Sequence, residues 1–62
     1  MNKKRILIVG FGAMGCRHAQ SFLDKKEDYD VHILEPSDKN IKQNIKRINA
    51  KKSDFTWYKN ID

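Results

Sequence analysis

The strongest constraint on the fold is the glycine pattern Gly10-x-Gly12-x-x-Gly15, which directly follows the apolar run Ile-Leu-Ile-Val at residues 6–9. A continuous run rich in β-branched residues is typical of a strand buried on both faces of a parallel sheet. Beyond the glycines, residues 13–24 repeat small and apolar side chains at helical spacing. One arc of that helix holds Gly15, Cys16, Ala19, Phe22 and Leu23. The pattern predicts a strand, a tight turn and a helix that packs back on the strand.

Each glycine of the turn has its own physical reason. Gly10 allows the tight turn, Gly12 lets a pyrophosphate approach the backbone, and Gly15 lets the helix pack close to the strand. The free amides of the first helical turn then point at the phosphates, with the helix dipole behind them. We therefore predict a dinucleotide site over residues 10–15. Its members are Gly10, Phe11, Gly12, Ala13, Met14 and Gly15.

The three variable positions of this loop are expected to act mainly through their backbone amides rather than their side chains. Met14 has two open interpretations, since its side chain could lie against the cofactor or fill the core. The alternative interpretation of residues 10–15 is a glycine-rich turn that binds no ligand.

The rest of the chain continues the alternation of strands and helices. Residues 31–34 form a second apolar run, and residues 55–58 have strong strand propensity. Between them, Ser37 or Asp38 can cap a helix whose apolar stripe is Ile41, Ile45 and Ile48. This order predicts an α/β fold, the first half of a Rossmann doubly wound parallel sheet with right-handed crossovers.

Glu35 ends the second predicted strand, about 20 residues after the last glycine of the loop. An acid at that point accepts hydrogen bonds from the adenosine ribose and repels the additional phosphate of NADP. No arginine follows it closely to take that phosphate, and Lys39 is the one nearby cation. We therefore expect NAD as the cofactor and NADP as the less favoured one. The alternative is a solvated acid beside a turn.

The other residues whose side chains could take part in catalysis or ligand binding are interpreted as structural. His18 could support local packing or approach the cofactor end of the strands. The structural role is favoured, because no catalytic partner for it is identifiable. Cys16 is expected to be a small buried residue, and His32 a packing residue of the second strand. Trp57 and Tyr58 are interpreted as strand packing rather than a stacking platform. No catalytic residue and no metal site are predicted.

Composition excludes several classes of protein. The net charge of +5 is spread along the chain, without a nucleic-acid motif, so we expect no nucleic-acid partner. No apolar run approaches the roughly 20 residues of a membrane helix, and we expect a cytoplasmic protein. The basic start and the apolar stretch up to Cys16 resemble a lipoprotein signal. The spaced glycines and the continuing amphipathic helix favour a folded domain instead.

Residues 6–18 resemble the N-terminus of the Gfo/Idh/MocA oxidoreductases. The resemblance rests on Gly10, Gly12, Met14, Gly15 and His18, together with the acid Glu35. It implies an NAD(P)-dependent enzyme that transfers hydride to or from a hydroxyl of a sugar, cyclitol or sugar nucleotide. The family's catalytic lysine and histidine would lie beyond residue 62.

The chain of 62 residues is short for a complete Rossmann domain. We expect residues 1–62 to be the N-terminal part of a dinucleotide-binding domain whose substrate domain lies outside this chain, in a parent that is a homo-oligomer. Three alternatives stay open. They are an FAD-binding domain, a regulatory domain that senses NAD without chemistry, and a small basic module that binds nucleic acid.

Overall fold

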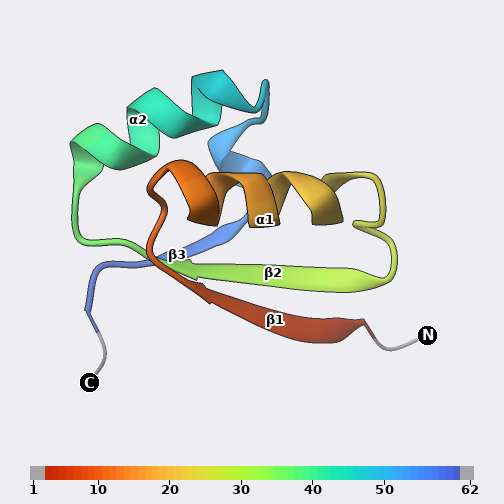
Figure 1. Ribbon diagram of the computed structural model, residues 1–62. Coiled ribbons are helices and arrows are strands. Elements are labelled where there is room, and N and C mark those ends of the chain that lie inside the picture. Colours follow the sequence, from red (N-terminus) through yellow and green to blue (C-terminus); the bar gives the residue numbers. More distant parts are fainter. Residues whose placement is uncertain (1–2, 61–62) are drawn as a thin grey trace.

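The computed structural model describes residues 3–60 as one parallel sheet with two helices (Figure 1). The sheet has three strands in the order β1-β2-β3, and both neighbouring pairs are parallel. The elements are β1 (Lys4–Val9), α1 (Ala13–Leu23), β2 (Tyr29–Leu34), α2 (Asp38–Arg47), a short 3-10 helix (Lys52–Asp54) and β3 (Thr56–Tyr58). This arrangement confirms the predicted first half of a Rossmann fold.

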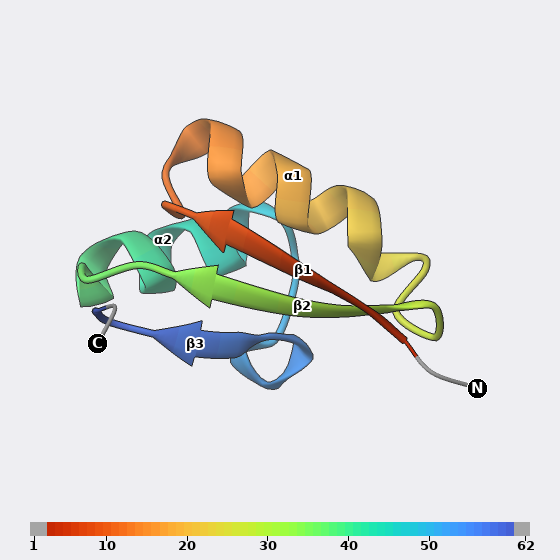
Figure 2. The same cartoon turned by 90° about the horizontal axis from the view of Figure 1, so that it is seen from below.

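Both helices cover the same face of the sheet (Figure 1). Successive crossovers of one hand, laid down in strand order, place their helices on one side. Seen from below, the opposite face of the three strands lies in front of the helices (Figure 2). No element of residues 3–60 covers this open face.

The one-sided cover overturns part of the prediction for β1. Ile8 points to the helices and is 9% exposed, whereas Leu7 and Val9 are 57% and 71% exposed. The expectation of burial on both faces is therefore wrong within the described residues. Side chains alternate along a strand, so helices on one face bury only every second residue.

The core lies between the sheet and the two helices. Cys16 and Ala19 of α1 are fully buried, as their helical arc predicts. Ile41 and Ile48 are buried and Ile45 packs against the core, which confirms the apolar stripe of α2. Ser37 is the N-cap of α2, with its hydroxyl accepting from the Asn40 amide at 3.2 Å. Within residues 3–60, no helix has the length and apolar character needed to cross a membrane.

Candidate functional site

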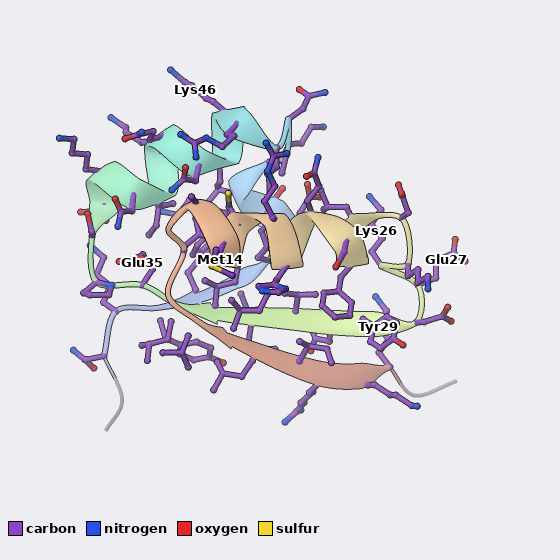
Figure 3. The ribbon with its side chains drawn as sticks, viewed as in Figure 1. Met14, Lys26, Glu27, Tyr29, Glu35 and Lys46 are labelled. Atoms are coloured by element: carbon purple, nitrogen blue, oxygen red, sulfur yellow. The ribbon has the colours of Figure 1, made fainter. Side chains whose placement is uncertain are left out.

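The candidate site lies where β1 and β2 end. The Gly10 amide donates to the Leu34 carbonyl at 2.8 Å, so β1 and β2 end side by side at the same edge of the sheet. The chain then enters the glycine loop after β1 and Glu35 after β2. Met14 and Glu35 lie toward this end of the molecule, whereas Lys26, Glu27 and Tyr29 lie at the other (Figure 3). Carboxyl ends of parallel strands are where open α/β sheets bind ligands.

Two of the three glycines are required by the backbone itself. Gly10 has φ +94°, a left-handed conformation that side chains other than glycine rarely adopt. A Cβ on Gly15 would collide with the Gly10 carbonyl oxygen, so the close packing of α1 on the turn depends on its absence. Both observations agree with the roles predicted for the first and last glycine.

Gly12 is different because a Cβ there would have no heavy atom within 4 Å. It is the N-cap of α1, and no side chain caps the helix at this point. The first intrahelical contact at this end is from the Cys16 amide to the Gly12 carbonyl, at 2.9 Å. The preceding amides have no partner inside the helix, and the first turn carries no acidic residue. This is a bare, electropositive helix terminus with space in front of it.

Phe11 anchors the loop to the core. Its side chain is fully buried, and its ring meets that of Trp57 edge-on at 5.0 Å between centroids. Its amide donates to Glu35 Oε1 at 2.7 Å, and its carbonyl accepts from Asn44 Nδ2 at 2.7 Å. The Phe11 side chain thus stabilises the turn together with its amide, a role that the glycine spacing alone did not predict.

Glu35 is buried, with 5% exposure, and holds two backbone amides at once. Oε1 accepts from Phe11, and Oε2 accepts from Ser37 at 3.0 Å. The Phe11 amide is the main reason that the pKa of Glu35 lies below its usual value, and the Ser37 amide adds to it against the opposing effect of burial. The carboxylate is therefore ionised at neutral pH.

Asn44 is the residue of this region that the sequence analysis missed. It is 4% exposed on the packed face of α2 and reaches the loop 33 positions earlier in the chain. Its Oδ1 has no hydrogen-bond partner among the described residues. The available signal was one polar residue inside the stripe formed by Ile41, Ile45 and Ile48.

Comparison with known protein families agrees with this geometry. The whole chain, residues 1–62, matches the family model described as "Putative NAD(P)-binding". The chain belongs to this NAD(P)-binding family. No curated protein and no solved structure matches it significantly. The match supports NAD(P) as the cofactor class and does not single out the Gfo/Idh/MocA oxidoreductases.

The remaining residues singled out in this NAD(P)-binding chain take different positions. Met14 is 76% exposed, so it does not fill the core, and it lies beside the bare helix terminus. His18 is also exposed and lines, with Met14, a groove of about 490 Å³ along β1. His18 is therefore not a core residue, and its expected role in local packing stays a prediction. The expected burial of Cys16 is confirmed.

The aromatic residues of β2 and β3 divide between the two faces of the sheet. Trp57 packs on Phe11 in the core, as predicted. Tyr58 is 42% exposed on the open face and stacks on His32 with centroids 5.7 Å apart. The His32 ring contacts Tyr58 Oη through Nδ1 at 2.8 Å and Asp30 Oδ2 through Nε2 at 2.9 Å. His32 thus packs against Tyr58 and joins a hydrogen-bonded chain on the open face.

Proposed function

We propose that this chain binds the pyrophosphate and adenosine ribose of NAD in an oxidoreductase of the Gfo/Idh/MocA type. The observation that carries the proposal is the bare N-terminus of α1, which faces open space at Gly12. Helix termini of this kind bind phosphate through free amides and the helix dipole. Met14, exposed beside that terminus, would lie along the cofactor.

Within the chain, residues 10–15 have different parts in binding. The amides of Gly12, Ala13, Met14 and Gly15 would donate to the pyrophosphate, because they precede the first intrahelical bond. Gly12 would allow the phosphates to approach, and Gly10 and Gly15 would shape the turn. The Phe11 amide is already hydrogen-bonded to Glu35, so Phe11 would anchor the loop and would not donate to the cofactor.

Glu35 would set the preference for NAD over NADP. Its carboxylate lies at the end of β2, directly after the strand that flanks the loop. Each oxygen accepts one backbone amide, and a carboxylate oxygen has a second lone pair for a ribose hydroxyl. The negative charge held there by the lowered pKa would repel the additional phosphate of NADP.

The chemistry would be hydride transfer between the nicotinamide and a carbon that carries a hydroxyl of a sugar, cyclitol or sugar nucleotide. The bound cofactor supplies the hydride chemistry, and residues 1–62 hold and orient it. A substrate domain and the residues that move protons would lie in the rest of the parent protein. Those parts of the proposal rest on the resemblance at residues 6–18 and Glu35.

The proposal is tested by isothermal titration of the intact protein with NAD and with NADP. Wild type should bind NAD more tightly, and Gly12→Val should abolish measurable binding because valine fills the space in front of the helix. Ser21→Val is the matched control, since it places the same side chain on an exposed position of α1. NAD affinity that survives Gly12→Val unchanged would overturn the assignment of the loop.

A further inference from the structure

Within residues 3–60 only two polar side chains are buried, Glu35 and Asn44. Both bind the backbone of one residue, Phe11, at 2.7 Å each. Burying a polar group costs free energy unless it is hydrogen-bonded, so such groups rarely gather at one point without a reason. Because Glu35 and Asn44 both bind the Phe11 backbone, we infer that the backbone conformation of Phe11 matters for function.

Packing alone does not explain Asn44. It lies among Ile41, Ile45 and Ile48 on the face of α2 that packs on the core. Its Oδ1 finds no hydrogen-bond partner in the described part of the chain. An apolar side chain of similar volume would fill the same place without an unpaired oxygen. The contribution of Asn44 therefore lies in the bond from its Nδ2 to the Phe11 carbonyl.

That bond sets the direction of a second group. The Phe11 carbonyl and the Gly12 amide belong to one planar peptide unit, and the chain has no cis peptide among its described residues. In a trans unit the C=O and N–H point in opposite directions. Turning the Phe11 carbonyl toward α2 therefore turns the Gly12 N–H away from α2.

We propose that Asn44 is a positioning residue that aims the Gly12 amide at the pyrophosphate of the cofactor. Glu35 fixes the preceding peptide unit through the Phe11 amide, and the buried ring of Phe11 keeps the loop from sliding. The inference rests on the proposed function, since it names the residue that orients one donor of the same site.

The test uses Asn44→Asp and Asn44→Leu in the intact protein. Aspartate keeps the shape of asparagine but replaces the donor by an oxygen, and leucine removes hydrogen bonding altogether. Ile48→Val is the control, because Ile48 is the C-cap residue of the same helix, is buried at 3% exposure and is not part of the loop. It lowers stability without touching the Phe11 carbonyl. Thermal unfolding identifies the variants that are folded.

Affinities for NAD, NADP and adenosine are then measured by titration, with the Gly12 amide followed by NMR in the free protein. Both Asn44 variants should bind NAD and NADP about tenfold more weakly or worse, the loss expected for one well-placed hydrogen bond to a charged group. Adenosine, which has no phosphate, should bind as it does to wild type. The Gly12 amide resonance should shift, and Ile48→Val should match wild type in every affinity.

The outcomes separate the two proposals. Wild-type protein that binds neither NAD nor NADP overturns the proposed function and this inference with it. Wild-type binding that is equally strong in both Asn44 variants overturns the inference alone. Equal losses for adenosine and NAD would also overturn it, because they would indicate general damage to the site. If the leucine variant does not fold, the aspartate variant decides.

Discussion

The Glu35 carboxylate accepts the Phe11 amide at 2.7 Å across 24 positions of sequence. The bond joins the end of β2 to the glycine loop that follows β1. A residue expected to face the ribose therefore also shapes the loop that would face the pyrophosphate. Because the Glu35 side chain is expected to serve both the ribose and the loop, substitutions of Glu35 have to change its charge and the loop geometry separately.

Glu35→Gln is the substitution that changes the charge with the least change of shape. The amide oxygen of glutamine can still accept from Phe11 or Ser37, while the negative charge is removed. We expect NAD to bind more weakly and the preference for NAD over NADP to fall. Titration of both cofactors against wild type and variant measures this ratio. A variant that keeps the wild-type preference would remove Glu35 from cofactor selection.

The same carboxylate predicts how stability depends on pH. The pKa of Glu35 is lowered in the folded state, chiefly by the Phe11 amide, from a usual value of 4.5. The ionised group therefore stabilises the folded state above that value, and this stabilisation is lost as the pH falls through the folded pKa. Urea unfolding of wild type should show the loss below about pH 4.5.

The comparison variant for this pH experiment is Glu35→Gln. Its unfolding midpoint should be lower than that of wild type at pH 7 and should fall less on acidification. The two other acids with lowered pKa values, Asp30 and Asp38, are present in both proteins and cancel in the difference. Parallel pH profiles for the two proteins would contradict the prediction.

Substitutions of Gly12 and Gly15 should differ in their effect on the stability of the fold. Gly15→Ala places a Cβ against the Gly10 carbonyl oxygen, a backbone atom that cannot move aside cheaply. We expect a loss of about 1–3 kcal/mol in the free energy of unfolding. Gly12→Ala meets no atom within 4 Å and should leave the unfolding midpoint nearly unchanged. Chemical denaturation of both variants tests this, and equal destabilisation would contradict the geometry of the turn.

Cys16 should resist alkylation in the folded protein. Its side chain is fully buried under α1, and its thiol lies 3.2 Å from the Ala13 carbonyl. A reagent can reach it only after α1 opens, so its labelling rate should rise with denaturant. Mass spectrometry of the peptide that contains Cys16 follows this residue alone. Rapid labelling under native conditions would show that α1 leaves the sheet readily.

Much of the fold follows from local pattern. The runs at residues 6–9 and 31–34, the glycine spacing and the isoleucine stripe each predict the element that forms, and the structure mainly lengthens the strands. β1 extends back to Lys4 and β2 to Tyr29, because a parallel partner stabilises backbone whose side chains are not apolar. The exposed face of β1 escaped prediction, since its composition does not reveal which faces helices will cover.

In the candidate site, the backbone roles of the glycines were predictable from the sequence, and the side-chain contacts to Phe11 were not. Spacing alone identified Gly12 as the open position and placed an acid after β2. It could not indicate that Glu35 bonds Phe11 or that Asn44 reaches the same residue. The first contact depends on the register of β1 and β2, and the second depends on how α2 crosses the loop. An asparagine on a helix rich in lysine looks like part of the solvated surface until the packing is known.

The edge-on contact between Phe11 and Trp57 has a practical consequence. Trp57 is the single tryptophan of these 62 residues, and its ring lies 5.0 Å from the residue that anchors the loop. Its fluorescence is therefore an intrinsic optical probe of that anchor, sensitive to any rearrangement that withdraws the Phe11 ring. Loop motion during ligand association can be followed by stopped-flow emission without attaching a dye.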